Sequence, residues 1–369
     1  YMIKIKSIEV YKYDLPLKEG RYNWSHQSSV SVFDSTIVKI NTNKNTFGFG
    51  EVCTLGPAYL PAYPEGVREG IKKIGNSLLG IDPTNLSEVN IQMDRNLKGH
   101  NYVKSAIDMA CWDILGKYTQ QPIWKMLGGK FGNDVKLYRA ISQESSKEMS
   151  KKVKKYKKEG YSKFQLKVGG NPEEDIERIK HVRSILDKTD VLVADANTGW
   201  LMHDALNVIN GIKDLDVYVE QPCISYNENL SVRKNTNKPF ILDESIDSVD
   251  SFLRAYNDKA MDIINIKISK IGGISKTKLL RDLCVELGIA MTIEDSWGGD
   301  IATSAISHLA HSTPEKYRFS STDFNSYNSV TYSKGAPQRK NGSFEASNKY
   351  GLGIEVNEKK LGKPSFVIL

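Results

Sequence analysis

Between Phe164 and Lys270, five short apolar runs each end in a charged residue: FQLK (164–167), VLVAD (191–195), DVYVE (216–220), PFILD (239–243) and IINIK (263–267). These charged ends follow one another at intervals of 23 to 28 residues. An apolar run with a polar tip, followed by a helical pattern, is typical of a βα unit. Several such units in succession predict a (β/α) barrel, in which the strand C-termini open onto the face that holds the active site.

The flanking sequence extends this pattern at both ends. VKLYRAIS (135–142) is expected to be the first barrel strand and RFSSTDF (318–324) the eighth. AMTIED (290–295) follows IINIK after an interval similar to those between the five runs. After FQLKVGG, Asn171 and Pro172 predict a helix start, because Asn is a favoured N-cap and Pro suits the first helical position.

The N-terminal third has a different pattern. Residues 2–13, 31–41 and 47–53 are predicted strands, and Val103, Ile107, Ala110 and Ile114 have the spacing of a buried helix face. Strands followed by helices predict an α+β domain over residues 1–125. We then expect a barrel over residues 126–335 and a C-terminal segment, 336–369, that returns to the first domain.

Composition places the chain among ordinary globular proteins. Its 369 residues are 40% hydrophobic and 26% charged, with a formal net charge of +7. The densest lysine run, between Lys151 and Lys158, shares a helix with Met149, Val153 and Tyr156, which are spaced as a buried stripe. The lysines are therefore expected to form a solvated helix face, and nucleic-acid binding is disfavoured.

The cysteines and the apolar runs bear on the cellular compartment. Cys53, Cys111, Cys223 and Cys284 form no CxxC pair and no zinc or disulfide spacing, so reduced, buried thiols are expected. The N-terminus alternates like a strand, and the sequence has no apolar run of 18 residues. We expect no signal peptide, no membrane span and a cytoplasmic location.

Three of the charged ends are carboxylates: Asp195, Glu220 and Asp243. Neighbouring parallel strands lie about 4.8 Å apart, so three anions at consecutive strand ends would repel one another without a cation. Hard oxygen ligands suit Mg²⁺, and the absence of His and Cys from these ends argues against zinc or iron. The alternative is that individual acids are solvated loop residues or helix caps.

The other two ends are lysines, Lys167 and Lys267, on the predicted second and sixth strands. Strands four apart in an eight-stranded barrel stand on opposite sides of its mouth, so two amines could face a substrate from both sides. A lysine with a lowered pKa can act as a general base, and a metal-bound carboxylate favours loss of the neighbouring α-proton. The alternative is that the lysines only neutralise the acids.

The motifs FQLKVGG, VADANTGW, YVEQP, ILDES and NIKISKIGG together resemble the mandelate racemase/muconate lactonizing enzyme group of the enolase superfamily, over essentially the whole chain. The resemblance implies an α/β fold, a modified (β/α)₇β TIM-like barrel with an N-terminal α+β capping domain. It implies Asp195, Glu220 and Asp243 as Mg²⁺ ligands, with Lys167 and Lys267 as acid/base catalysts. Gln165 departs from the usual Lys-x-Lys of this group, which removes one cation but keeps a hydrogen-bond donor for a substrate carboxylate.

EDSWGGD (294–300) and SSTDFN (320–325) bear on the substrate. In dipeptide epimerases of this group an Asp at the end of strand eight holds the substrate ammonium, which implies that role for Asp323 and an amino-acid substrate. Asp323 could instead cap a helix. Asp295 is a further candidate contact, and Trp297 is either a wall of the site or ordinary packing.

The pattern resembles most closely the branch that includes cis-3-hydroxy-L-proline dehydratases and hydroxyproline betaine 2-epimerases. Betaine enzymes hold a quaternary ammonium on an aromatic face, whereas a carboxylate such as Asp323 suits a secondary ammonium. We therefore expect a Mg²⁺-dependent dehydratase of cis-3-hydroxy-L-proline, with a 2-epimerase of proline betaines, amino acids or dipeptides as the alternative. Trp24 and Tyr59 belong to cap loops that could close over the substrate, or could be cap core. We also expect a homo-oligomer.

Overall fold

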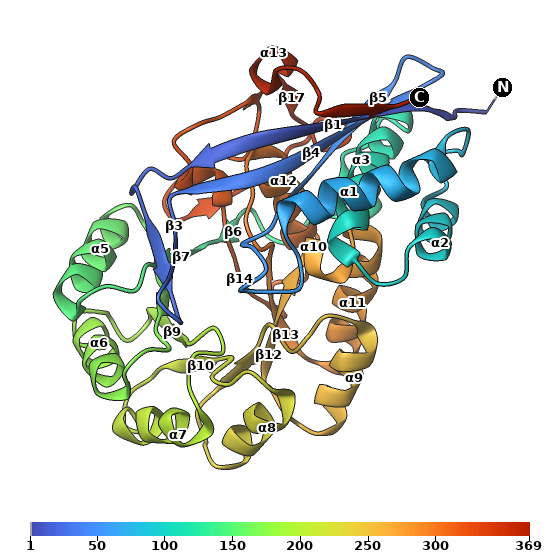
Figure 1. Cartoon of the computed structure of the whole chain (residues 1–369). Helices are drawn as coiled ribbons and strands as arrows, with labels where there is room; N and C mark the ends of the chain where they lie inside the picture. The colour runs from blue at the N-terminus through green and yellow to red at the C-terminus, as the bar shows by residue number, and fades with distance from the viewer. Residues whose placement is uncertain (1) are drawn as a thin grey trace.

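The computed structural model describes residues 2–369, and its centre is an eight-stranded parallel sheet curled into a barrel (Figure 1). The sheet runs in chain order from β7 to β14, and an isolated parallel bridge between Leu137 and Ser321 joins its two ends. Its strands are β7 (Tyr138–Ile141), β8 (Lys163–Lys167), β9 (Val191–Asp195), β10 (Tyr218–Glu220), β11 (Phe240–Leu242), β12 (Ile263–Lys267), β13 (Ala290–Glu294) and β14 (Arg318–Ser321).

Helices follow each of the first seven barrel strands and lie outside them, as Figure 1 shows for α5 to α9. These helices are α5 (Ser146–Lys158), α6 (Pro172–Ser184), α7 (Met202–Gly211), α8 (Tyr226–Lys234), α9 (Val249–Asn257), α11 (Ile274–Leu287) and α12 (Asp300–His311), with the short α10 (Ile268–Ile271) before α11. The predicted (β/α)₇β barrel is confirmed.

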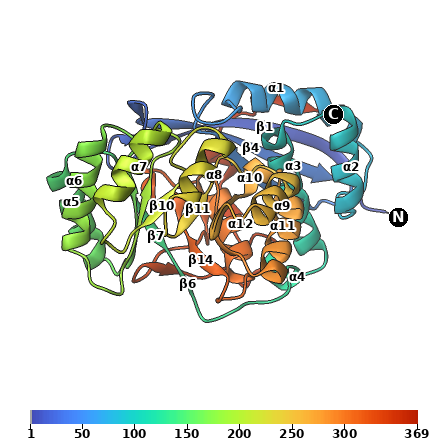
Figure 2. The same cartoon turned by 90° about the horizontal axis from the view of Figure 1, so that it is seen from below.

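A second, antiparallel sheet of four strands carries helices and covers one side of the barrel (Figure 2). Its strand order is β18 (Phe366–Ile368), β1 (Ile5–Pro16), β4 (Val32–Thr42) and β5 (Phe47–Cys53). The helical segments of this cap are α1 (Pro64–Gly75), η1 (Asn76–Leu78), α2 (Leu86–Asn96) and α3 (Asn101–Tyr118). The α+β cap is confirmed, and the boundaries at residues 125 and 335 stay predictions.

Short elements connect the two parts. β2 (Tyr22–Trp24) and β3 (Ser28–Val30) form a hairpin that runs from the cap toward β9 (Figure 1). The others are α4 (Ile123–Met126), β6 (Val135–Lys136), η2 (Phe324–Tyr327), β15 (Ser333–Lys334), β16 (Ser343–Phe344), β17 (Glu355–Val356) and α13 (Glu358–Leu361). The predicted first barrel strand is therefore divided, because β6 pairs with β16 and only β7 enters the barrel.

Local sequence signals explain the barrel helices. Asn171 caps α6 by accepting hydrogen bonds from two backbone amides, as predicted. On α5, Met149, Val153 and Tyr156 are buried, and most of the lysines between Lys151 and Lys158 are exposed. The lysine-rich face is thus the solvated face of a helix whose apolar stripe packs on the barrel.

Two glycines of the FGFGEVC motif allow α3 to lie close to β5. A Cβ atom at Gly50 would stand 1.8 Å from the carbonyl oxygen of Ala106, and one at Gly48 would stand 2.2 Å from that of Ala110. Both partners are helix backbone, which cannot move aside as a flexible side chain would. The motif therefore fixes the packing of the helix on the cap sheet.

A buried carboxylate ties the cap to the barrel. Glu51 on β5 is fully buried and accepts hydrogen bonds from the backbone amides of Gly299 (3.0 Å) and Ala302 (2.8 Å) at the start of α12. The hydroxyl of Tyr332 also donates to it at 2.7 Å. An anion at a helix N-terminus satisfies amides that have no partner within the helix, so Glu51 aligns the cap with strand β13 and the loop that precedes α12.

The four cysteines have the buried positions that the sequence predicts. Cys53, Cys111, Cys223 and Cys284 are free and buried. Across residues 2–369, every helix is too short or too polar to cross a membrane.

A pH-dependent loss of stability is expected from His308, which is fully buried on α12. Its Nδ1 accepts a hydrogen bond from the Trp124 amide (3.1 Å), and its Nε2 lies 3.0 Å from the Leu352 carbonyl oxygen, so the neutral ring uses both nitrogens. Burial lowers the pKa of His308 to about 4, whereas an unfolded histidine titrates near 6.5. Stability from this group is therefore complete above about pH 6.5 and is lost as the pH falls toward 4, by roughly 2 kcal/mol at pH 5.

The measurement is the free energy of urea unfolding at pH 7.5 and pH 5.0. His308→Gln is expected to be less stable at pH 7.5 but to lose roughly 2 kcal/mol less than the unsubstituted protein between the two pH values. The exposed His203→Gln is the matched control, with an unchanged difference. Equal pH dependence in all three proteins would show that the native protein takes up a proton on the His308 ring by pH 5.0 as readily as the unfolded chain does.

Candidate active site

The charged strand ends meet at one end of the barrel. In the parallel register Lys167 lies opposite Asp195, and Asp195 lies opposite Glu220. Asp243 directly follows β11, and Lys267 ends β12. All five side chains are buried, with at most 8% of any residue exposed.

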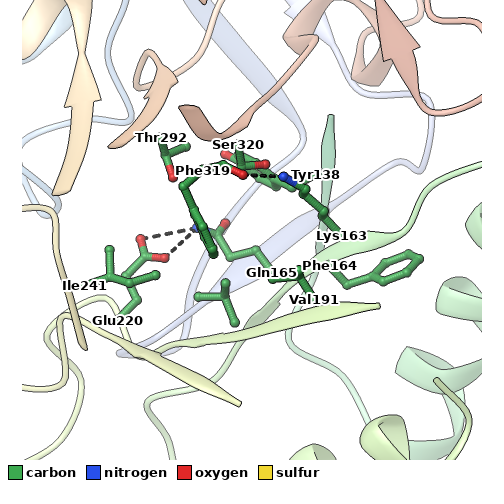
Figure 3. Close-up of a pocket in the computed structure, with 11 residues that line it drawn as sticks. Tyr138, Lys163, Phe164, Gln165, Val191, Glu220, Ile241, Thr292, Phe319 and Ser320 are labelled. Atoms are coloured by element: carbon green, nitrogen blue, oxygen red, sulfur yellow. Dashed lines mark hydrogen bonds between the residues drawn. The ribbon is translucent and has the colours of Figure 1, made fainter. Parts of the chain in front are cut away.

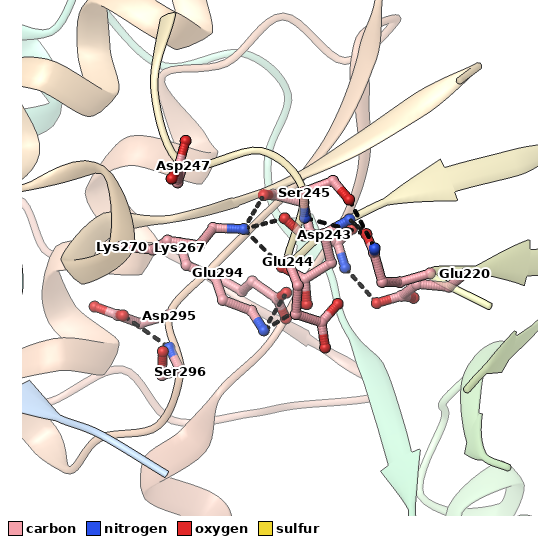
Figure 4. A network of polar contacts seen from close by, with 12 residues as sticks. Glu220, Asp243, Glu244, Ser245, Asp247, Lys267, Lys270, Glu294, Asp295 and Ser296 are labelled. Carbon is pink, nitrogen blue, oxygen red and sulfur yellow. Dashed lines mark hydrogen bonds and ion pairs between the residues drawn. The ribbon is translucent and has the colours of Figure 1, made fainter. Parts of the chain in front are cut away.

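Ion pairs join the lysines to two of the acids. Lys167 Nζ contacts Asp195 Oδ2, and Lys267 Nζ lies 2.6 Å from Asp243 Oδ2. Lys270, to which the sequence assigned no role, places its Nζ 2.8 Å from Asp243 Oδ1 (Figure 4). The two aspartates are therefore shared among three amines.

These pairs decide the charge state of the lysines. Burial, the largest single effect, would lower the pKa of Lys167, but Asp195 and its acidic neighbours together outweigh burial and hold that pKa above its ordinary value. Asp243, together with Glu294 and Glu244, does the same for Lys267. Both lysines are thus ammonium groups in this arrangement, and a lysine acts as a base only once its carboxylate partner is neutralised.

Glu220 is held by amides instead. Gln165 Nε2 donates to both of its carboxylate oxygens, at 3.2 and 3.0 Å (Figure 3). Asn265 Nδ2 also donates to Glu220, at 2.6 Å. Burial, and after it the charges of Asp195 and Asp243, raise the pKa of Glu220 well above its ordinary value. The predicted substrate contact Gln165 therefore binds a carboxylate of the protein in this structure.

Further acids make the site rich in negative charge. Glu294 is buried and Glu244 is half-buried beside the same cluster, and loss of hydration raises the pKa of Glu244 to about 8 and that of Glu294 to about 7. Carboxylates that raise one another's pKa in this way lack a compensating cation. The donor type and the excess of negative charge therefore suit a divalent ion with oxygen ligands such as Mg²⁺.

The three acids predicted as metal ligands do not yet form a closed ligand set. Within residues 2–369, no three His, Cys, Asp or Glu side chains are grouped so that they could hold a metal as they stand. The cause is visible in their partners, since lysines and amides take the oxygens of Asp195, Asp243 and Glu220. Metal binding by these acids stays a prediction.

A small cavity opens beside the lysines. It is lined by Tyr22, Trp24, Leu55, Tyr59, Tyr138, Ala140, Gln165, Lys167, Asn197, Lys267, Glu294, Asp295, Ser296, Trp297 and Phe324. Both catalytic candidates therefore face one small cavity whose walls come from the barrel and the cap.

The cap reaches the site through two segments. Tyr59 donates a hydrogen bond to Asp243 Oδ2 (3.0 Å) and accepts one from Lys267. The β2–β3 hairpin brings Trp24 to the cavity, and the hydroxyl of Ser25 at its tip donates to the carbonyl oxygen of Asn197 at 2.9 Å. Trp24 and Tyr59 thus line the cavity, and their closing over a substrate stays a prediction.

The hairpin tip rests on glycines, and Gly199→Ala is expected to displace it. A Cβ atom at Gly199 would stand 2.3 Å from the Gly169 carbonyl oxygen and 2.8 Å from Ser25 Cβ. Overpacking of this kind typically costs about 1–3 kcal/mol, so the hairpin shifts and the KM for substrate rises roughly tenfold or more.

Steady-state kinetics of Gly199→Ala and of Gly170→Ala test this. Gly170 is a matched control in the adjoining loop, because its added Cβ would meet only the movable amide of Gln143 at 3.0 Å. An unchanged KM in Gly199→Ala would mean that the hairpin is not part of the substrate cavity.

Asp323 is not among the residues that line this cavity, and the substrate contact predicted for it stays a prediction. β14 ends at Ser321, and Asp323 starts the short η2 helix, where its Oδ1 accepts a hydrogen bond from the Tyr161 hydroxyl at 3.3 Å. It is fully buried near Arg139, a residue of β7 whose guanidinium donates a hydrogen bond to the Tyr156 hydroxyl on α5. Asp323 precedes η2 at its N-cap position, the place of the alternative left open by the sequence, but its side chain makes no capping hydrogen bond there.

Asp295 and Trp297 line the cavity but are largely engaged elsewhere. Asp295 accepts hydrogen bonds from the backbone and hydroxyl of Ser269 and from the Ser296 amide (2.7 Å). The Trp297 ring is 2% exposed and stacks on Phe33 with 4.4 Å between ring centroids. Trp297 is thus mainly packing, one of the two alternatives left open.

Sequence reasoning missed Glu294 and Tyr138, which both line the cavity. Glu294 ends β13 opposite Lys267, and its carboxylate accepts a hydrogen bond from Tyr138 on β7. The signal for Glu294 was present, since AMTIE ends in a charge like the five other runs. Nothing in the sequence marked Tyr138 as more than a strand residue.

The fold and the site together define the class of protein. Residues 17–128 match the N-terminal domain of the mandelate racemase / muconate lactonizing enzyme family, and residues 148–360 match the enolase C-terminal domain-like family. The chain belongs to this family, within the enolase superfamily, and is an enzyme of that superfamily.

Particular relatives narrow the comparison. The chain is 54% identical to a cis-3-hydroxy-L-proline dehydratase from Roseibium aggregatum, over 98% of this chain and 99% of the relative. It is 32% identical to an L-Ala-D/L-Glu epimerase from Clostridium acetobutylicum, over 83% and 86% of the two chains. A crystal structure of an enolase-superfamily member from Roseovarius nubinhibens complexed with magnesium matches with a TM-score of 0.94 and 33% identity, over 99% of each chain.

Proposed function

We propose that this protein is a Mg²⁺-dependent lyase that dehydrates cis-3-hydroxy-L-proline to pyrroline-2-carboxylate. The observation that carries the proposal is the 54% identity, over nearly the whole of both chains, to a dehydratase of that substrate. The site supports it, because Lys167 and Lys267 extend from strands β8 and β12 into one small cavity beside several carboxylates.

The stereochemistry of the substrate fits two lysines. In cis-3-hydroxyproline the hydroxyl lies on the same ring face as the carboxylate and therefore opposite the α-hydrogen. One lysine, as the free amine, takes the α-proton, and the electron pair of that C–H bond forms the C2–C3 double bond. The other lysine, as ammonium, protonates the departing hydroxyl, which leaves as water. The enamine product then tautomerises to the cyclic imine.

Asp195, Glu220 and Asp243 would hold the Mg²⁺. When bound, the ion supplies positive charge that makes a proton next to the substrate carboxylate more acidic. The protein's own groups do the rest: Tyr59 orients Lys267, Gln165 orients Glu220, and Trp24 narrows access of water to the cavity.

The deciding experiment is incubation of the purified protein with cis-3-hydroxy-L-proline and MgCl₂ in D₂O, followed by NMR. We expect the C2 and C3 protons of the substrate to disappear together as the imine acid forms. Unchanged hydroxyproline that carries deuterium at C2 would overturn the dehydratase assignment.

That second outcome would favour an epimerase. The specific support for it is the similarity to the L-Ala-D/L-Glu epimerase, since removal and return of one proton would need the same pair of lysines. A panel of prolines, their betaines and dipeptides in the same assay would then identify the substrate. The cytoplasmic location and the homo-oligomer stay predictions.

A further inference from the structure

An amino-acid substrate brings a positively charged nitrogen into the cavity, and Asp323 is not among the residues that line that cavity. Of the residues that line the cavity, Glu294 and Asp295 carry carboxylates that are not among the predicted metal ligands. The question is which of these two acids can still accept a hydrogen bond from a substrate.

Asp295 is already committed to the protein. Its Oδ1 takes hydrogen bonds from the Ser269 hydroxyl, the Ser269 amide (3.2 Å) and the Ser296 amide (2.7 Å), and its Oδ2 lies 3.2 Å from the same Ser269 amide. These bonds connect the ends of β12 and β13. A ligand would have to break this connection to use Asp295.

Glu294 is differently placed. Its Oε2 accepts the hydrogen bond from Tyr138, which fixes the carboxylate, while its Oε1 lies 3.9 Å from Lys267 Nζ, beyond hydrogen-bond distance. The residue is 2% exposed, so an ammonium placed against Oε1 would make a charge-assisted hydrogen bond shielded from water.

The Trp297 ring is not placed to bind a quaternary ammonium by a cation–π contact. Phe33 stacks on that ring at 4.4 Å with an interplanar angle of 22°, and Phe324 lies 4.8 Å away at 32°. A cation needs an open ring face for a cation–π contact. The rings around Trp297 therefore favour a ligand that hydrogen-bonds over one that only stacks.

We propose that Glu294, positioned by Tyr138, binds the ring ammonium of the substrate and selects secondary amines over quaternary ones. The proposal rests on the proposed function, because it takes a proline derivative as the substrate. A secondary ring ammonium has two N–H donors, whereas an N,N-dimethylated ring has none and would leave the buried Glu294 oxygen without a partner. Because the α-carbon is bonded to this nitrogen, Glu294 also keeps the reacting C–H in the cavity that Lys167 and Lys267 face.

The test compares binding of L-proline and N,N-dimethyl-L-proline to the Mg²⁺-loaded protein by calorimetry. L-Proline lacks the leaving hydroxyl, so it reports binding without elimination. The unsubstituted protein is expected to bind L-proline about 100-fold more tightly than the dimethylated ligand. In Glu294→Gln that ratio is expected to fall to within about tenfold of unity, through weaker binding of L-proline.

Tyr138→Phe and Thr292→Val complete the design. Tyr138→Phe removes only the hydroxyl that fixes Glu294, so the KM for cis-3-hydroxy-L-proline should rise more than kcat falls, and the binding ratio should drop part of the way. Thr292 is buried on the same strand, two residues before Glu294 and below the cavity, and Thr292→Val should leave the ratio unchanged.

A ratio in Glu294→Gln equal to that of the unsubstituted protein would overturn the proposal, as would an unsubstituted protein that binds both ligands equally. If Glu294→Gln does not fold, the test depends on Tyr138→Phe, in which the ratio of the two affinities should drop part of the way; an unchanged ratio there would overturn the proposal. Failure of the proposed function looks different: cis-3-hydroxy-L-proline would not be dehydrated, while the preference for the secondary amine would still disappear in Glu294→Gln.

Discussion

Replacing either Lys167 or Lys267 by alanine is expected to lower the rate of dehydration by at least about 1000-fold, because each lysine moves a proton that the reaction cannot do without. Both side chains face the same cavity, whose lining includes no other lysine among residues 2–369. Lys270 is bound to the side-chain and backbone oxygens of Asp243. The measurement is kcat with cis-3-hydroxy-L-proline at saturating Mg²⁺.

The two variants should differ in a second assay, exchange of the α-proton of L-proline with D₂O. The lysine that removes the α-proton is needed for exchange and for elimination, whereas the lysine that protonates the hydroxyl is needed for elimination alone. One alanine variant is therefore expected to lose both activities and the other to keep exchange. Lys163→Met, at the opposite end of the same strand as Lys167, is the matched control with near-normal rates. Normal dehydration in Lys167→Ala or Lys267→Ala would exclude the two-lysine scheme.

How far the sequence predicts this site depends on whether a residue belongs to the repeating βα pattern. Lys167, Asp195, Glu220 and Lys267 end strands, and parallel strands in register must bring their ends together, so their meeting follows from periodicity. Glu294 obeys the same rule and was overlooked only as a site residue.

Asp323 shows where the pattern stops giving information. It lies two residues beyond the end of β14, where the pleat no longer fixes the direction of the side chain and η2 turns the chain away. The resemblance predicts a substrate contact for Asp323, whereas in the structure Asp323 does not line the cavity beside the lysines. The roles of Tyr138 and Tyr59 could not be predicted from the sequence for another reason. Their contacts depend on how the cap and β7 pack against distant strands, which no local sequence pattern encodes.

Removal of divalent cations is expected to abolish dehydration, and MgCl₂ to restore it. Without a cation, Asp195 and Asp243 hold Lys167 and Lys267 as ammonium groups, so no amine is free to take the α-proton. The measurement is activity after treatment with EDTA and after addition of Mg²⁺, together with Mg²⁺ binding by calorimetry. Full activity of the EDTA-treated protein would contradict the proposed metal site.

The affinity of variants for Mg²⁺ then tests which residues hold the ion, because loss of a ligand weakens binding whereas loss of a competing lysine does not. Glu220→Gln removes an oxygen ligand and should weaken binding at least about 10- to 100-fold, whereas Glu244→Gln, next to Asp243, is the matched control and should weaken it only a few-fold. Lys267→Ala should bind Mg²⁺ at least as tightly as the unsubstituted protein, because Lys267 Nζ, 2.6 Å from Asp243, competes with the ion for the same carboxylate. Weaker binding in Lys267→Ala would contradict this competition and would mean that Lys267 stabilises the metal site.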